Sequence, residues 1–251
     1  MLYNQVKLRE LHIIPFSTDN FNEMKPELRK TADGSHTLYV KELKEHYHST
    51  YGAITEAMHI FINSALLLRQ CKSLTVFEAG FGTGLNCLLT ALEAGKRNIK
   101  IYYIGVDLFP LDREILSLLN YPQILKGDSS WLWDKIHNAS WNQPTTLTDY
   151  FYLHKVKTDL ALSPIPTGLP LFDIIYFDAF APNVQPEMWE SGIFKKISER
   201  CNPGAVFSTY SSNGQVRRNL ATAGFTMEKL PGPPGKKEIL RGIIAGKFYS
   251  K

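Results

Sequence analysis

The stretch Val76-Phe77-Glu78-Ala79-Gly80-Phe81-Gly82-Thr83-Gly84-Leu85-Asn86 decides the fold of this chain. It predicts an apolar strand, a glycine-rich turn and a helix that begins near Leu85. Glycines at alternate positions allow the backbone to turn sharply and leave no side chain between the turn and a ligand. The helix N-terminus behind the turn offers unpaired N–H groups to a polar or anionic group. A ligand site is therefore expected at this turn, against the alternative of a glycine-rich turn that binds nothing.

The residues around the glycines narrow the kind of ligand. No Lys-Ser or Lys-Thr pair follows them, so Mg-nucleotide chemistry is not expected, and the spacing differs from the G-x-G-x-x-G dinucleotide fingerprint. Glu78 stands just before the turn, where its carboxylate would repel a pyrophosphate. A carboxylate in this place suits a ligand that carries an ammonium group, such as the methionine end of S-adenosylmethionine.

Length and composition describe an ordinary globular protein. The 251 residues suffice for one substantial domain with a small appendage, and 44% are hydrophobic and 21% charged. Without an apolar run of about 18 residues or a signal-peptide pattern, a cytoplasmic protein that makes no use of a membrane is expected. The net charge of +4 permits a polyanionic partner without demanding one. The three isolated cysteines lack metal-ligand spacing, so reduced structural thiols and no metal site are expected.

Two further apolar strands are followed by acidic residues. Residues 101–107 form a continuous apolar run that is typical of a buried parallel strand and ends in Asp107. A carboxylate there can accept hydrogen bonds from both ribose hydroxyls of a nucleoside. Residues 149–157 predict the next strand, after which Asp159 could accept a hydrogen bond from the exocyclic amine of adenine. An N-cap role explains Asp159 equally well.

A fourth strand, residues 172–178, again ends in an acid, Asp178. In open α/β sheets the ligand lies beyond the carboxyl ends of the strands, near the point where the strand order reverses. Asp178 is therefore expected beside the glycines at 80–84. Pro182 and Pro186 stiffen the loop that follows, which suits the positioning of a reacting group.

The N-terminal part departs from this alternation. The turn formers in residues 1–40, followed by an apparent strand at 37–40, suggest a hairpin-like extension. Residues 42–52 are dense in His and Tyr and are interpreted either as a polar loop stacked on the domain or as a lid or wall over a ligand. Residues 54–70 predict one amphipathic helix, in whose first turn Glu56 suits the helix dipole without any function.

The complete pattern predicts a Rossmann-like α/β fold. An insertion at about 108–149 carries three tryptophans, for which a core position is favoured over a base-stacking or partner surface. Residues 225–246 predict a closing hairpin, which would place one antiparallel strand in a doubly wound, seven-stranded sheet. This arrangement resembles class I S-adenosylmethionine-dependent methyltransferases. We expect an N-terminal extension at 1–52, packed on a methyltransferase domain at 53–251.

Several segments in the same order carry a more specific resemblance. They are Glu78-Ala79-Gly80-Phe81-Gly82-Thr83-Gly84-Leu85-Asn86, Asp178-Ala179-Phe180-Ala181-Pro182 with Pro186-Glu187-Met188-Trp189, and Val216-Arg217-Arg218-Asn219-Leu220 with Ala223-Gly224-Phe225. Together they resemble the tRNA 5-methylaminomethyl-2-thiouridine-forming methyltransferase family, the MnmC type. Asp33-Gly34-Ser35-His36-Thr37-Leu38-Tyr39 and Glu45-His46-Tyr47-His48-Ser49 resemble its single-domain branch.

The resemblance implies methyl transfer from S-adenosylmethionine to the primary amine of a 5-aminomethyl-(2-thio)uridine at the tRNA wobble position. Two-domain members also carry an FAD oxidase that removes a carboxymethyl group first. No second glycine fingerprint occurs in the 251 residues, so that oxidase activity is not expected here and a separate enzyme would supply the precursor. Residues 211–215 and 233–237 differ from the two-domain members, in segments that are expected to touch tRNA.

The resemblance also assigns roles to residues. Asp178 would orient the amine and accept its proton, while Glu78 would hold the ammonium of the cofactor, Asp107 its ribose and Asp159 its adenine. The other expected cofactor-binding residues are Gly80, Phe81, Gly82, Thr83, Gly84 and Asn86. Phe180 and Pro182 would shape the substrate pocket. The cations expected to contact tRNA phosphates are Arg217, Arg218, Lys236, Lys237 and Arg241.

Two rival functions remain open at this point. A transferase for a free small amine fits the fold and the acid after the fourth strand, although the polyamine synthases have loops with consecutive glycines. A non-catalytic tRNA- or nucleoside-binding module is the second, and the set Glu78, Asp107 and Asp178 counts against it.

Overall fold

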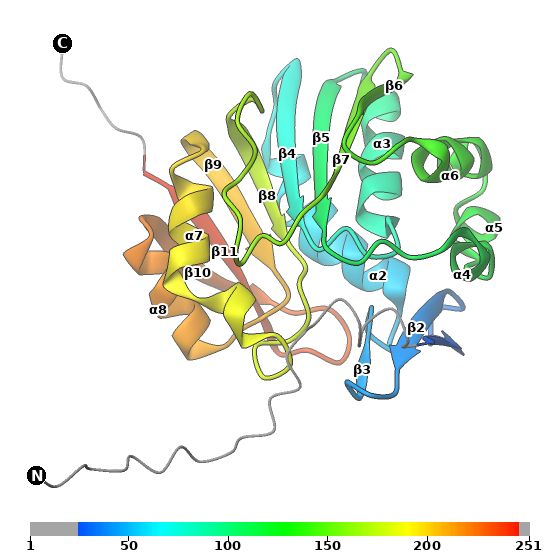
Figure 1. Ribbon diagram of the computed structural model, residues 1–251, viewed down its shortest axis with the longest axis horizontal. Coiled ribbons are helices and arrows are strands. Elements are labelled where there is room, and N and C mark those ends of the chain that lie inside the picture. Colours follow the sequence, from blue (N-terminus) through cyan, green and yellow to red (C-terminus); the bar gives the residue numbers. More distant parts are fainter. Residues whose placement is uncertain (1–24, 246–251) are drawn as a thin grey trace, which may run out of the picture.

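Eight strands form the central sheet in residues 25–245, the part of the chain that this computed structural model describes (Figure 1). Their order across the sheet is β10-β11-β9-β8-β4-β5-β7-β6. The strands are β4 (Ser73–Ala79), β5 (Lys100–Asp107), β6 (Pro144–Thr148), β7 (Phe151–Lys157), β8 (Phe172–Phe177), β9 (Cys201–Thr209), β10 (Phe225–Pro231) and β11 (Glu238–Ile244).

The pairing confirms the predicted fold class and adds one strand. β7, β5, β4, β8 and β9 are parallel, and the hairpin of β10 and β11 places β11 antiparallel to β9. These are the seven expected strands with one antiparallel to its neighbours. The eighth, β6, pairs antiparallel with β7 at the edge. Its sequence, Pro-Thr-Thr-Leu-Thr, lacks the apolar alternation by which a strand is recognised, so it was not predicted.

The strand order reverses at β4, and this positions the site. From β4 the chain proceeds outward through β5 and β7, and then returns to the other side of β4 with β8 and β9. The carboxyl ends of β4 and β8 therefore flank the switch point, where α/β sheets bind their ligands.

Both faces of the sheet are buried, as the continuous apolar runs predicted. On β4, Val76 belongs to one apolar cluster and Phe77 to the other, because successive side chains point to opposite faces. The first cluster includes residues of α3 and α6, and the second includes residues of α7 and α8 (Figure 1). The helices are α2 (Ala53–Ala57), α3 (Leu85–Arg97), α4 (Arg113–Ser117), α5 (Tyr121–Leu125), α6 (Ser129–Asn138), α7 (Ser191–Ser198) and α8 (Gly214–Thr222).

The single helix predicted for residues 54–70 is wrong. The α-helix ends after Ala53–Ala57 and continues as a π-helix, Met58–Asn63, before a 3-10 turn at Leu66–Leu68. Ser208 of β9 donates a hydrogen bond of 2.7 Å to the Ile60 carbonyl. Three consecutive apolar residues of the π-helix, 60–62, are buried in the core.

A small antiparallel sheet confirms the predicted N-terminal hairpin. β1 (Glu27–Lys30) pairs with β2 (His36–Val40), which pairs with β3 (Glu45–His46). Asp33, in the turn between β1 and β2, accepts hydrogen bonds from the Thr55 backbone N–H and hydroxyl, both 2.9 Å, and so ties the sheet to α2. Residues 1–24, the first part of the predicted extension, lie outside the described residues.

The predicted insertion contains α4, α5 and α6 and leads into β6. Trp133 is buried against Tyr121, and Trp141 packs against Phe81 below the glycine turn, so the core interpretation holds for both. Trp131 differs, since it is 49% exposed with the Lys135 ammonium over its ring. None of the helices between residues 25 and 245 combines the length and the apolar character needed to cross a bilayer.

Candidate active site

A cavity of about 800 Å³ opens at the carboxyl ends of β4, β5, β7 and β8. This size lies within the usual range of small-molecule sites, ~300–1,000 Å³. Its floor includes Gly80, Gly82, Asp107 and Asp178, and its opposite wall comes from residues 45–51. The cavity therefore lies at the switch point of the sheet, as the sequence predicted.

The glycine turn can be built only from glycine at its first position. Gly80 has φ +88°, and a Cβ on it would lie 2.5 Å from the Asp178 backbone oxygen. Both Gly80 N–H and Phe81 N–H donate to the Val106 carbonyl at 3.0 Å, and Gly84, with φ +78°, caps the start of α3. The backbones of β4 and β8 thus approach each other where a side chain would keep them apart.

Asp107 is held rigidly at the end of β5. Its two carboxylate oxygens accept 2.8 Å hydrogen bonds from the backbone N–H groups of Gly82 and Phe109. Burial raises the pKa of Asp107, although these hydrogen bonds oppose the rise. Each oxygen has a second lone pair. Asp107 lines the cavity and can therefore accept hydrogen bonds from a ligand as well.

Asp178 lines the cavity at the end of β8 and is fixed from below. The Asn86 side chain of α3 donates one hydrogen bond to Asp178 Oδ2 and another to Glu78 Oε1, both 2.9 Å. Burial raises the pKa of Asp178 to about 7, and the neighbouring charge of Glu56 raises it further against the opposing effects of Asn86 and Lys236. A carboxylate with this pKa can exchange protons near neutral pH.

Glu78, the residue expected to meet a ligand's ammonium, lies beneath the glycine turn. Glu78 is 0% exposed and does not line the cavity. Glu78 follows Val76 by two positions on β4, so its side chain points to the α3 face, where the Tyr103 hydroxyl donates a 2.7 Å hydrogen bond to it. Burial raises its pKa well above the usual range. Glu78 therefore supports Asn86 from below.

Only part of the expected cofactor set lines the cavity. Gly80, Gly82, Asp107 and Asp159 do so. One Asp159 oxygen also accepts hydrogen bonds from the N–H groups of Ala161 and Leu162, but these residues form a turn and not a helix, so the N-cap alternative is wrong. The members that do not line it are Glu78, Phe81, Thr83, Gly84 and Asn86. They lie on the α3 side of the turn, which the glycine spacing alone does not distinguish from the ligand side.

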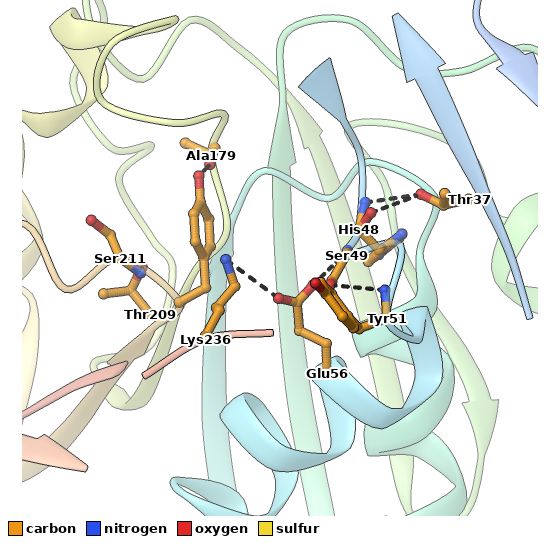
Figure 2. Close-up of polar contacts among 10 residues, drawn as sticks. Thr37, His48, Ser49, Tyr51, Glu56, Ala179, Thr209, Ser211 and Lys236 are labelled. Carbon is orange, nitrogen blue, oxygen red and sulfur yellow. Dashed lines mark hydrogen bonds and ion pairs between the residues drawn. The ribbon is translucent and has the colours of Figure 1, made fainter. Parts of the chain in front are cut away.

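Residues 45–51, in the His- and Tyr-rich segment, form one wall of the cavity. The Tyr47 ring lies over the glycine turn, 3.2 Å from the position of a Cβ on Gly82, and packs edge-on against Phe180. Buried His48 donates its backbone N–H to the Thr37 hydroxyl at 3.0 Å, and burial lowers its pKa to about 4 (Figure 2). This segment is a fixed wall of the cavity in which His48 is an anchor.

The expected substrate-binding residues separate into three groups. Phe180 and Lys236 line the cavity, whereas Pro182 does not. Three other cations are exposed on the surface: Arg217 and Arg218 of α8, and Lys237, which follows Lys236 in sequence. The guanidinium of Arg241 binds Glu228 at 2.5 Å and the Ser64 carbonyl at 3.1 Å, so it joins β11 to β10 and to the segment after the π-helix. Sequence reasoning missed Tyr210 and the contribution of Glu56, both of which line the cavity.

Lys155 of β7 is buried below the site, and no carboxylate in residues 25–245 forms an ion pair with it. It is 2% exposed and lies over the Trp141 ring, 5.2 Å from its centroid. Burial lowers its pKa from the ordinary 10.5 to about 8, while Cys87 raises it and Arg113 lowers it. At neutral pH the native state therefore carries a buried charge that destabilises it.

Replacing this charge is expected to stabilise the protein. Lys155→Met should raise the free energy of unfolding at pH 7 by about 2 kcal/mol, and the gain should fall toward zero between pH 8 and 10.5. Between these pH values the unfolded wild type binds more protons than the native state, so wild-type stability rises with pH. Urea unfolding at pH 7 and pH 10 measures the difference. Exposed Lys157→Met, on the same strand, is the control, and an equal gain in both variants would contradict the explanation.

Comparison with known proteins identifies the relatives of this chain. Residues 135–245 match a protein family described as S-adenosyl-L-methionine-dependent methyltransferase. The tRNA 5-methylaminomethyl-2-thiouridine biosynthesis bifunctional protein MnmC of Magnetococcus marinus is 31% identical over 215 residues, covering 79% of this chain and 31% of the relative. MnmC of Pseudoalteromonas atlantica is 29% identical over 254 residues, covering 90% of this chain and 34% of the relative.

The chain is a homologue of the methyltransferase part of the MnmC proteins. It spans about a third of the length of these curated relatives. The crystal structure of MnmC2 from Aquifex aeolicus has a TM-score of 0.72 at 22% identity, covering 92% of this chain and 78% of that one. Its similarity shows the same fold. S-adenosylmethionine is the cofactor of the matched family, which agrees with the cofactor that the glycine turn and the strand-end acids predicted.

Proposed function

We propose that this chain transfers the methyl group of S-adenosylmethionine to the primary amine of a 5-aminomethyl-(2-thio)uridine at the wobble position of tRNA. The observation that carries the proposal is Asp178, a carboxylate with a pKa of about 7 in the same cavity as the glycine turn and Asp107. The names of the MnmC relatives, which specify 5-methylaminomethyl-2-thiouridine biosynthesis, supply the substrate.

The residues present fit the cofactor. Gly80 and Gly82 line the cavity without a side chain, which permits close approach of a ligand to the backbone. In this proposal Asp107 accepts hydrogen bonds from the ribose hydroxyls and Asp159 from the adenine amine. S-adenosylmethionine, when bound, supplies an electrophilic methyl group whose carbon–sulfur bond breaks as the carbon–nitrogen bond forms. The cavity wall at Tyr47 and Phe180 limits the access of water to this reaction.

Asp178 would prepare the amine for attack. An alkylammonium has no free lone pair, so the nitrogen must lose a proton before it can accept a methyl group. The ionised carboxylate can accept that proton, since its pKa of about 7 lies close to neutral pH. Asn86 holds Asp178 Oδ2, which leaves the other oxygen of the carboxylate to face the amine.

A group of cations beside the cavity mouth would contact the tRNA backbone. The hydrogen bond from Lys229, and after it the charges of Lys237 and Arg217, lower the pKa of Glu238. These cations therefore gather on one surface. It is continuous in sequence with Lys236, which lines the cavity. Phosphate contacts from such a surface contribute affinity without reading sequence.

Removing two of these cations should weaken tRNA binding in a salt-dependent way. For Arg217→Ala combined with Lys237→Ala we expect a Kd for tRNA several-fold higher and a slope of log Kd against log salt reduced by about two, one for each lost contact. Filter binding between low and moderate salt measures both quantities. Lys100→Ala, an exposed cation at the opposite end of β5, is the control. An unchanged slope in the double variant would remove this surface from the proposal.

The decisive experiment follows the methyl group. The protein is incubated with labelled S-adenosylmethionine and tRNA from cells that accumulate the aminomethyl-uridine intermediate, and the tRNA is digested to nucleosides. A labelled methylaminomethyl nucleoside is the expected result. If tRNA remains unlabelled while free amines become labelled, the chain is a small-amine transferase; if nothing is labelled although the cofactor binds, it is a binding module.

The substrate chemistry also implies a preceding reaction. A 5-aminomethyl group must be produced on the uridine before this methylation, and we propose that an enzyme activity outside residues 1–251 supplies it. Labelling of tRNA only from cells that make the aminomethyl intermediate would support this dependence.

A further inference from the structure

Three segments that are distant in sequence meet at the mouth of the cavity. Glu56 of α2, residues 49–51 and the loop at 232–237 come together there (Figure 2). The Ser49 N–H donates a 2.7 Å hydrogen bond to Glu56 Oε2, and the Lys236 ammonium lies 3.6 Å from Oε1. The two side chains are 12% and 31% exposed, so this ion pair is largely withdrawn from water.

The distance between the Lys236 ammonium and Glu56 Oε1 is too long for a hydrogen bond. Glu56 Oε1 is buried and has no hydrogen-bond partner in the described part of the chain, because 3.6 Å is longer than an N–H···O hydrogen bond. A buried carboxylate oxygen that lacks a hydrogen bond is unfavourable. A group that donates one directly to Oε1 would therefore bind better than Lys236 does.

The pair lies next to the carboxylate proposed to react. The Lys236 ammonium lies 4.7 Å from the centroid of the Tyr210 ring, and the Tyr210 hydroxyl donates 2.8 Å to the carbonyl of Ala179, which follows Asp178. The charges of Glu56 and Lys236 act in opposite directions on the pKa of Asp178. Glu56, Lys236 and Asp178 therefore form one electrostatic unit inside the cavity.

We propose that Glu56 is the second carboxylate of the amine site and binds the substrate's ammonium group in place of Lys236. This inference rests on the proposed function, because it concerns the amine that Asp178 is proposed to deprotonate. A lysine side chain and an aminomethyl pyrimidine both end in a primary alkylammonium. A position that holds the ammonium of Lys236 is chemically suited to hold that of the substrate.

The exchange gives each carboxylate a separate task. The substrate enters as the ammonium that predominates at neutral pH, and Glu56 holds it by charge. Asp178 then takes one proton from the nitrogen, so that a neutral amine with a free lone pair faces the methyl donor and Asp178 is neutral. Glu56 then holds the methylated ammonium product. Displaced Lys236 joins neighbouring Lys237 at the mouth, where a phosphate of the RNA can bind it.

Glu56→Gln tests the first half of the proposal. Glutamine keeps an oxygen that can accept the Ser49 N–H, so the wall should remain in place. We expect the Kd of the free nucleoside 5-aminomethyluridine, measured calorimetrically in the presence of S-adenosylhomocysteine, to rise about tenfold, with the Kd of S-adenosylmethionine and the melting temperature unchanged. The limb of the pH–rate profile assigned to Asp178 should move to lower pH, since a neighbouring negative charge has been removed.

Lys236→Met tests the second half, because it removes the competing cation. The free nucleoside should bind several-fold more tightly to this variant. The affinity for tRNA should stay the same or fall, since a phosphate contact is lost. Lys100→Met, which lies at the other end of the sheet, should change neither value. Opposite effects on nucleoside and tRNA cannot arise from a general loss of structure.

The outcomes separate this inference from the proposed function. Unchanged nucleoside affinity in Glu56→Gln, or weaker nucleoside binding in Lys236→Met, would overturn the exchange, as would wild-type protein that does not bind the nucleoside. Wild-type protein that binds the nucleoside in this Glu56-dependent way but never methylates it would overturn the proposed function alone.

Discussion

Asp178→Asn is expected to lower kcat for aminomethyl-uridine tRNA by about 10²–10⁴-fold, the usual contribution of a general base. Asparagine has nearly the same shape and can still accept the Asn86 hydrogen bond, but it cannot accept a proton from the amine. The Kd of S-adenosylmethionine should change little, because Asp178 is proposed to act on the substrate. Single-turnover methylation and calorimetric cofactor titration measure the two quantities separately.

The pH dependence provides a second readout of the same residue. Wild-type turnover should rise with pH as Asp178 ionises, with a midpoint near its pKa of about 7. The matched variant Asp159→Asn should instead weaken cofactor binding and keep this pH limb. If Asp178→Asn loses cofactor affinity and turnover in the same proportion, Asp178 binds the donor and is not the base.

Gly80→Ala should damage both stability and cofactor binding. Its methyl group would lie 2.5 Å from the Asp178 backbone oxygen, and alanine is strained at φ +88°. We expect a loss of about 2–4 kcal/mol in the free energy of unfolding and a cofactor Kd at least about tenfold higher, since β4 and β8 must separate. Thermal or urea unfolding and calorimetry measure these effects.

Gly95→Ala is the internal comparison for that variant. Gly95 lies in α3, where a methyl group would meet no atom of a neighbouring described residue within 4 Å, and its φ is not positive. Alanine there should stabilise the helix by roughly 0.5–1 kcal/mol. If Gly80→Ala keeps the stability and the cofactor affinity of the wild type, the turn can shift without cost. The close approach of β4 and β8 would then not require glycine at this position.

The sheet could be predicted because its central strands have clear apolar patterns in the sequence. Residues 101–107 and 172–178 are continuous apolar runs that end in acids, and the glycine turn fixes the switch point between them. Apolar periodicity does not report the pitch of a helix. In the π-helix at Met58–Asn63 the Ile60 carbonyl accepts a hydrogen bond from Ser208, 148 positions later, a contact that local sequence does not reveal, and a single α-helix was expected there.

The site was predictable where a residue's role follows from its place at a strand end. Asp107 and Asp178 are such residues, and both line the cavity. Glu78 is buried and does not line the cavity, and sequence alone did not show this, because one position along a strand changes the face on which a side chain lies. Glu56 was explained by the dipole of its own helix, since its partners Ser49 and Lys236 belong to other segments. Contacts of this kind exist only in the folded chain.

The contact between Glu56 and Lys236 has a consequence for the ribosome-bound chain. The glycine turn and Asp178 are made well before the loop at 232–237, whose Gly235 lies against the Tyr51 ring. During synthesis the floor of the cavity can therefore form while one part of its wall has not been translated. Until the hairpin of β10 and β11 is made, Glu56 has no Lys236 beside it, so in the proposed exchange the emerging polypeptide would lack the cation that competes with the substrate's ammonium.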